Sequence, residues 1–226
     1  MGVTPIDLGN IMEAVEALKK VGESRSRKPR FNESVELIVN LKDIDLKRPE
    51  RRITDVAELP HEIGKKVRIC FFASGDMALR AQRAGADLVI DRQEIERIAG
   101  DKREAKKLAN AYDFFFAEAP LMPLVGRTLG RFLGTRGKMP IPVPPGAPVE
   151  DVIARGRRSV RLRMRDQPVL KCRVGTMDMD SKNISENVQA VLNRIEGRLE
   201  KGLRNIKSVI LKTTMSPKVQ VSLGRS

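Results

Sequence analysis

The pattern of apolar residues changes type twice along the chain of 226 residues. At residues 34–41, 160–164 and 170–174, apolar residues alternate with polar ones, which is the period of a strand buried on one face. Between about residues 63 and 156, short strands that are apolar on both faces alternate with helical segments, as in a parallel sheet covered by helices. The pattern therefore predicts an α+β domain made from both chain ends, with an α/β domain inserted in it.

The first predicted domain comprises residues 1–62 and 157–226. It is expected to be a split β-α-β domain, in which two amphipathic helices pack on an antiparallel sheet. Thr4 suits the N-cap of the first helix, and Ser181 is a candidate cap for the second. The strands SVILK and VQVSL near the end of the chain are expected to be joined by the turn TTMSP.

The inserted domain, residues 63–156, is expected to be a Rossmann-like three-layer α/β domain. The stretch before it, residues 46–65, is rich in charge and proline and is predicted to be an irregular crossing. Prolines between residues 140 and 148 exclude a helix or a central strand there and predict a loop. Two strand-like connections, near residues 63–67 and 155–159, are expected to act as a hinge between the domains.

The charge balance points to a polyanionic partner. The chain has 43 Lys and Arg against 29 Asp and Glu, a net charge of +14, and residues 157–226 hold 16 of the basic and 6 of the acidic side chains. There is no Trp, one Tyr and seven Phe, so stacking of single-stranded bases on aromatic rings is not expected to be the main binding mode. Double-helical RNA, which offers phosphates and 2′-hydroxyls, suits this composition better.

Other classes of protein are excluded or disfavoured. No apolar run approaches the roughly 20 residues that span a bilayer, and the N-terminus lacks the pattern of a signal peptide, so a cytosolic protein with no membrane partner is expected. Cys70 and Cys172 lie 102 residues apart, which excludes a disulfide framework and a CxxC metal site. Both are expected to be inert thiols in the core.

A nucleotide-dependent enzyme on the inserted domain is the alternative from another class. Its first strand-to-helix turn has one glycine, Gly75, where the dinucleotide fingerprint needs three, and GTRGK at residues 134–138 lacks the spacing of a phosphate loop. His61 is the one histidine and is expected to be a solvated surface residue. Asp178 and Asp180 precede a helix and are expected to cap it. The sequence predicts no catalytic residue, no metal site and no cofactor.

Two basic segments could contact RNA, although on composition alone such a segment is more often an ordinary solvated loop. The first is RSRKPRF, which contains Arg25, Arg27 and Lys28 and ends at Arg30 and Phe31. The second is the turn KTTMSPK, from Lys212 to Lys218. In addition, alternation in residues 160–165 predicts a strand with a basic face that carries Arg161.

Four ordered segments carry a resemblance to a known family. They are FNESVELIVNLKDID, LGTRGKMPIPVP, VGTMDMDSKNISENVQAVLNRI and KSVILKTTMSP. In these segments the chain closely resembles the L-one family of large-subunit ribosomal proteins, in its archaeal type. The resemblance implies a non-enzymatic protein of the mobile lateral stalk of the ribosome in the cytoplasm, near the site where deacylated tRNA leaves.

The resemblance also implies partners and site residues. The implied partners are the large-subunit rRNA stalk, the exit-site tRNA, and the leader or coding region of the protein's own mRNA, whose translation it would repress; the free protein would be a monomer. The implied RNA contacts, with Lys212 and Thr213 of the basic turn and Arg161 added from the sequence pattern, are Arg30, Phe31, Ser34, Arg161, Gly175, Ser208, Lys212, Thr213, Thr214, Met215 and Ser216. Secondary contacts are implied at Arg136, Gly137 and Lys138. Ser216 stands where the family usually has glycine, which is expected to alter affinity, and Thr135 stands where it often has proline. A ribosome-independent RNA chaperone is a third reading of the same features.

Overall fold

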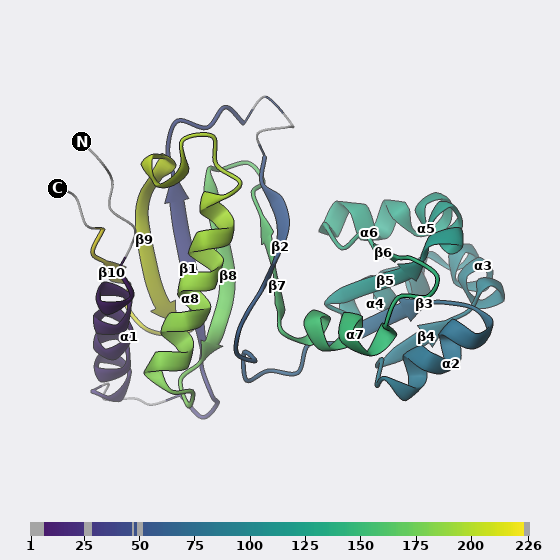
Figure 1. The fold of residues 1–226 in the computed structure, drawn as a ribbon, viewed down its shortest axis with the longest axis horizontal. Helices are drawn as coiled ribbons and strands as arrows, with labels where there is room; N and C mark the ends of the chain where they lie inside the picture. The colour runs from purple at the N-terminus through teal and green to yellow at the C-terminus, as the bar shows by residue number, and fades with distance from the viewer. Residues whose placement is uncertain (1–6, 25–28, 47, 49–51, 224–226) are drawn as a thin grey trace. The chain divides into compact units, whose positions relative to one another are not determined.

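The computed structural model describes residues 7–24, 29–46, 48 and 52–223, and they form a mixed α/β protein, as the sequence predicts (Figure 1). The chain divides into two compact units. Unit 1 comprises Met1–Lys65 with Arg158–Ser226, and unit 2 comprises Lys66–Arg157.

Unit 1 contains an antiparallel four-stranded sheet in the order β10-β9-β1-β8. Its strands are β1 (Ser34–Leu41), β8 (Val169–Thr176), β9 (Ile206–Thr213) and β10 (Val219–Val221). Along β1, buried residues from Val35 to Leu41 alternate with half-buried ones, because one face of the sheet lies under helices α1 (Leu8–Glu23) and α8 (Ser181–Glu196). The strand predicted at residues 34–41 is confirmed.

The helix starts differ from the sequence prediction. Thr4, the predicted cap of α1, lies outside the described residues, and Asp7 precedes Leu8 at the N-cap position. Ser181 is the first helical residue of α8 rather than its cap, because Asp180 occupies the N-cap position without a capping hydrogen bond from its side chain. The last turn before β9 is a short 3₁₀ helix, Gly202–Asn205.

A second, two-stranded antiparallel sheet in unit 1 joins β2 (Thr54–Glu58) to β7 (Ser159–Arg163). The prediction of an irregular crossing over residues 46–65 is therefore wrong for β2. This strand has few apolar residues of its own, and its extended form depends on hydrogen bonds to β7, which lies about a hundred residues away in sequence.

Unit 2 is built on a parallel sheet in the order β4-β3-β5-β6. Its strands are β3 (Ile69–Phe72), β4 (Leu88–Ile90), β5 (Phe114–Glu118) and β6 (Ile141–Val143). Its helices are α2 (Gly75–Arg83), α3 (Arg92–Gly100), α4 (Lys102–Ala111), the 3₁₀ helix Ala119–Leu121, α5 (Met122–Thr128), α6 (Gly130–Arg136) and α7 (Val149–Arg157).

Both faces of the parallel sheet are buried, as its apolar strands predict. On one face Phe72 stacks on Phe115 with ring centroids 6.0 Å apart, within the core shared with α3 to α6. On the other face Phe71 stacks on Phe116, also at 6.0 Å. A Cβ at Gly156 in α7 would lie 2.9 Å from the Phe116 ring, so glycine allows α7 to pack closely on this face.

Two further predictions in unit 2 are corrected. Residues 141–143 form β6 rather than a loop, and this strand accommodates Pro142 because it lies at the edge of the sheet. The connection predicted as a strand near residues 155–159 is the end of α7 at Arg157, followed by the start of β7 at Ser159. Residues 63–67 are likewise not a strand.

Burial raises the pKa of both cysteine thiols, that of Cys172 to about 12. Cys70 is fully buried and Cys172 is half-buried. Because the pKa of each thiol is raised, neither ionises near neutral pH. Within the described part of the chain, no helix has the length and apolar character needed to cross a membrane.

Candidate nucleic-acid interface

Three strand ends meet at one end of the unit 1 sheet. Ser34 at the start of β1 is opposite Thr176 at the end of β8, and Val35 is opposite Thr213 at the end of β9. Residues 30–34 and 213–217, called here the turn end, therefore lie together although about 180 residues separate them in sequence. Most of the residues predicted to bind RNA belong to this end.

The turn end presents exposed apolar and polar side chains. Phe31 is 55% exposed and Met215 is 67% exposed, which is unusual for such large apolar groups. Arg30 and Thr214 are exposed as well. At one place, the arginine can contact a phosphate and the threonine hydroxyl can contact a ribose hydroxyl. The two apolar side chains can cover the RNA surface around these contacts.

Glu33 connects the two segments of the turn end. Its side chain is buried, with 4% of the residue exposed. Its carboxylate oxygen Oε1 accepts a hydrogen bond from the Met215 N–H at 2.7 Å and another from the Thr213 hydroxyl at 3.1 Å. Its carbonyl accepts from the Met177 N–H at 3.0 Å, just beyond β8. The sequence prediction missed Glu33, since a single acid between Asn32 and Ser34 carries no signal of burial.

Thr213 and Ser216 face inward. The Thr213 N–H donates to Ser216 Oγ at 2.8 Å, and the Ser216 N–H donates to Thr213 Oγ1 at 3.1 Å. Both residues are buried, so their hydroxyls lie inside the turn and not on its surface. Among described residues other than glycine, positive φ occurs at Asp43 alone, so the backbone of Ser216 is unstrained at the position where the resemblance implies glycine.

The half-buried side of β1 continues the candidate interface along the sheet. Glu36 on this side is opposite Lys212 in β9 and Arg173 in β8, and Ile38 is opposite Lys171. Directly paired residues project to the same face, so the three cations share the face away from α1 and α8, called here the open face.

Ser208 lies on the open face but far from the turn end. It is opposite Asn40, whose side-chain amide donates to Ser208 Oγ at 2.8 Å. Five residues along a strand separate it from Thr213, a distance of roughly 17 Å. A ligand that contacts both positions must therefore lie along the sheet.

Two predicted contacts lie elsewhere in unit 1. Gly175 is opposite Val35 on the helix side, where a Cβ would lie 3.0 Å from Met179 Sδ and 3.1 Å from Ile184 Cγ1, so this glycine allows close approach of α8. Arg161 is opposite Val56 in the two-stranded sheet. Neither residue belongs to the turn end.

The predicted secondary contacts in unit 2 have structural partners. Gly137 has φ of 67° and ends α6 in the left-handed conformation. The Lys138 ammonium donates to the carbonyls of Ala109 at 3.0 Å and Tyr112 at 2.6 Å, and Arg136 Nε donates to Asn110 Oδ1 at 2.8 Å. Arg136 and Lys138 thus hold the C-terminal end of α4.

The geometry of unit 2 disfavours the enzyme alternative. Glu118 at the end of β5 accepts hydrogen bonds from the Ser74 N–H and the Ser74 hydroxyl, each at 3.2 Å. Its carboxylate therefore lies at the start of α2, where a dinucleotide phosphate binds in nucleotide-dependent enzymes of this topology.

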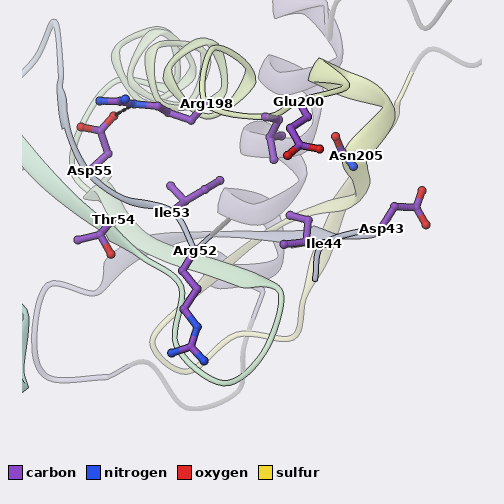
Figure 2. A pocket seen from close by; sticks show the side chains of 10 residues that line it. Asp43, Ile44, Arg52, Ile53, Thr54, Asp55, Arg198, Glu200 and Asn205 are labelled. Carbon is purple, nitrogen blue, oxygen red and sulfur yellow. Dashed lines mark hydrogen bonds and ion pairs between the residues drawn. The ribbon is translucent and has the colours of Figure 1, made fainter. Parts of the chain in front are cut away.

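A pocket of about 220 Å³ in unit 1 is lined by ten residues, half of them charged, and three of the charged residues, Arg52, Asp55 and Arg198, make hydrogen bonds within the protein (Figure 2). Asp55 in its wall receives hydrogen bonds from Arg198 Nε at 2.7 Å and Arg194 at 3.0 Å. Burial by itself would raise the pKa of Asp55, but these hydrogen bonds, with one from the Val56 N–H, outweigh it and lower the pKa to about 2. The cluster anchors β2 to α8.

Replacing Asp55 tests this anchor. Asp55→Asn is expected to lower the free energy of unfolding at pH 7 by about 1 kcal/mol, a value reduced for the half-exposed arginines. Because the pKa of Asp55 is lower in the folded protein than in the unfolded chain, the ionised carboxylate stabilises the folded state above the unfolded pKa of about 4. This stabilisation is lost as pH falls towards about 2. In urea titrations the difference between variant and wild type should shrink over that range. A constant difference would contradict the ion-pair explanation.

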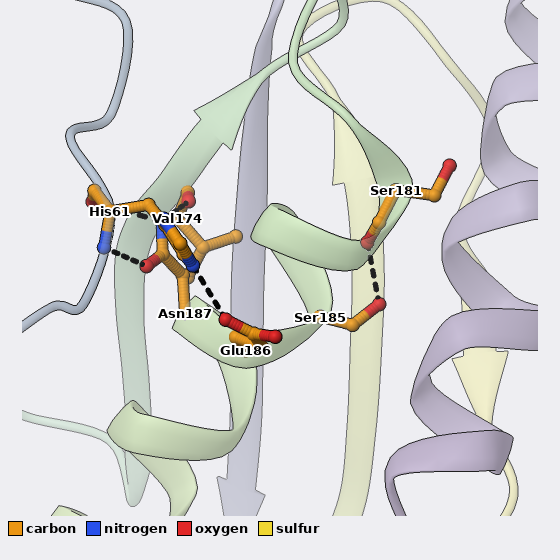
Figure 3. A network of polar contacts seen from close by, with 6 residues as sticks. All are labelled: His61, Val174, Ser181, Ser185, Glu186 and Asn187. Carbon is orange, nitrogen blue, oxygen red and sulfur yellow. Dashed lines mark hydrogen bonds and ion pairs between the residues drawn. The ribbon is translucent and has the colours of Figure 1, made fainter.

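The prediction that His61 is a solvated surface residue holds only in part, because a third of its side chain is exposed and the ring has a partner within the protein. Its Nε2 lies 2.5 Å from Glu186 Oε2, and both groups are about two-thirds buried (Figure 3). Its N–H donates to Asn187 Oδ1 at 3.0 Å, and Asn187 Nδ2 donates to the His61 carbonyl at 3.1 Å and the Val174 carbonyl at 2.8 Å. The network fastens the segment after β2 to α8 and β8.

The same segment is fixed a second time at Gly64. Its φ is 69°, and a Cβ there would lie 2.3 Å from Thr176 Oγ1. His61 and Gly64 are therefore structural residues of unit 1, and neither belongs to the turn end.

A two-unit α/β protein with a basic open face fits the class of structural ribosomal proteins. The family described as "Ribosomal protein L1p/L10e family" matches residues 12–217, and the chain belongs to this family. The large ribosomal subunit protein uL1 of Methanothermobacter thermautotrophicus is 47% identical over 92% of this chain and 98% of its own length. The proteins of that name from Archaeoglobus fulgidus and Pyrococcus horikoshii are 47% and 49% identical, over 96% and 95% of this chain and 99% and 96% of their own lengths. The resemblance to the archaeal type is confirmed.

Proposed function

We propose that the chain is a non-enzymatic protein of the large ribosomal subunit, which binds large-subunit rRNA and forms the mobile lateral stalk near the tRNA exit site. The observation that supports this most is the turn end, where exposed Phe31, Thr214 and Met215 stand beside a sheet face with three cations. Exit-site tRNA is the second RNA partner in this proposal.

The proposed complex divides the contacts between the two surfaces. On the open face, Lys171, Arg173 and Lys212 bind phosphates, which gives affinity without sequence preference. At the turn end, the Thr214 hydroxyl binds a ribose 2′-hydroxyl or a base edge, and Met215 covers that contact. Arg161, Arg136 and Lys138 are at most secondary contacts.

The same surface supports a regulatory role. A stem in the protein's own mRNA that has the shape of the rRNA stalk would compete for the turn end, so that free protein represses its own translation. In this proposal the protein acts as a monomer in the cytoplasm. We also assign unit 1 to the split β-α-β class and unit 2 to the Rossmann-like three-layer class, on their strand orders.

Unit 1 alone is expected to bind the rRNA stalk. A fusion of residues 1–65 to 158–226 through a short linker should retain most of the affinity, since it keeps the turn end and the open face. The junction is favourable because the Leu59 N–H donates to the Arg158 carbonyl at 2.8 Å, where the insert leaves unit 1. Filter-binding titrations of the full chain and the fusion with stalk RNA measure this directly.

The same titrations distinguish the three readings. A random duplex of equal length and purified nucleotides serve as competing ligands, and a melting curve shows that the fusion is folded. A folded fusion without specific binding would contradict the assignment to unit 1. Equal affinity for both RNAs would favour a chaperone, and tight nucleotide binding by the full chain would favour an enzyme.

A further inference from the structure

The side chain of Ser216 is turned into the protein, although its neighbours Thr214 and Met215 are exposed. We propose that Ser216 is a positioning residue. With Thr213 and Glu33 it forms a buried clasp that fixes the shape of the turn before RNA binds. The inference rests on the proposed RNA-binding function of the turn end and assigns to Ser216 a role other than direct RNA contact.

The clasp is a closed set of hydrogen bonds. Ser216 Oγ accepts from the Thr213 N–H at 2.8 Å and donates to the Pro217 carbonyl at 2.9 Å. Thr213 Oγ1 accepts from the Ser216 N–H at 3.1 Å and donates to Glu33 at 3.1 Å. Glu33 also accepts from the Met215 N–H at 2.7 Å. Three amides of one turn are thus bound by side-chain oxygens of the clasp.

The clasp fixes the backbone of Thr214 and Met215, which lie between Thr213 and Ser216. Thr214 and Met215 project into solvent, so the backbone around them sets where they point. A turn that populates several shapes binds with an affinity reduced by the fraction in the competent shape. Ser216 raises this fraction through a bond that glycine cannot form, and glycine would also widen the backbone freedom of the turn.

This role has a kinetic signature. Loss of the clasp lowers the population that is ready to bind, so the association rate constant falls and the dissociation rate constant is unchanged. Loss of a direct contact, as in Thr214→Val, raises the dissociation rate constant instead. For one lost hydrogen bond the expected fall in association rate is about threefold to tenfold.

The test uses the full chain with Ser216→Ala and Ser216→Gly. Stopped-flow binding to stalk RNA should show the slower association in both variants, with Ser216→Gly at least as slow as Ser216→Ala. Hydrogen exchange of the Thr213 and Met215 amides in the free protein should be faster in both. Thr128→Val is the matched control, because it removes one hydroxyl bond to a backbone carbonyl, at 2.8 Å, in unit 2.

Each result decides between defined alternatives. Unchanged association and unchanged exchange in both variants would overturn the clasp. Faster dissociation with unchanged association would show that Ser216 contacts RNA directly and would also overturn it. If wild-type protein fails to bind stalk RNA, the proposed function fails, and the exchange rates of the free protein still show whether the clasp exists.

Discussion

Thr214→Val is expected to weaken binding to the rRNA stalk about tenfold or more. The substitution keeps the shape of the side chain and removes its hydroxyl, which leaves the RNA group opposite unpaired in a desolvated contact, at a cost of about 1 to 3 kcal/mol. Thr214 is uncharged, so the dependence of binding on salt and the affinity for random duplex should not change.

Replacing a lysine of the open face is expected to have a different effect from replacing Thr214. Lys212→Ala should weaken binding to all RNAs similarly and flatten the salt dependence, because Lys212 lies on the open face. Met215→Ala combined with Thr214→Val should be non-additive, since the two residues cover one contact. Filter binding at several salt concentrations, beside a melting curve for each variant, measures these effects. Affinities of both Thr214 and Met215 variants within twofold of wild type would mean that the segment is only a turn.

Asn187→Ala is expected to lower the free energy of unfolding by about 2 to 4 kcal/mol. Asn187 is fully buried, and its amide binds both backbone groups of His61 and the Val174 carbonyl. Alanine leaves these groups without their partner and frees the segment after β2 from α8. Urea unfolding at pH 7 measures the loss.

Asn193→Ala is the matched control for Asn187→Ala. Asn193 is on the same helix, but it is exposed and accepts a hydrogen bond from Gln189 at 2.9 Å. This variant should change the free energy of unfolding by less than about 0.5 kcal/mol. Equal losses in both variants would contradict the structural role of Asn187. RNA affinity of folded Asn187→Ala protein should remain within about twofold, because the network lies outside the turn end.

Those elements whose apolar pattern is complete within the segment could be predicted from the sequence. In residues 34–41 an apolar residue recurs at every second position, although Ile38 between them is apolar as well, and β1 has the predicted bounds and burial. The Phe-rich strands of unit 2 are apolar on both faces and form a parallel sheet. In contrast, β2 has no such pattern, and only pairing with β7 makes it a strand.

The candidate site could be predicted only in part. Exposed residues such as Phe31 and Met215 stand out in basic or turn-forming segments, and the strand register then brings them together. Glu33 could not be identified, because its role depends on Met215 and Thr213, about 180 residues away in sequence. The hydrogen bonds of His61 could not be predicted for the same reason, since its partner Asn187 is 126 residues away.

Crosslinking of the full chain to total cellular RNA, with both the RNA segments and the crosslinked peptides mapped, tests the RNA-binding role of unit 1 most directly. The expected result is that bound RNA is concentrated in one stalk of the large-subunit rRNA and that the peptides contain residues 30–34 or 213–217. Crosslinks spread over many unrelated RNAs, or peptides confined to residues 66–157, would contradict it.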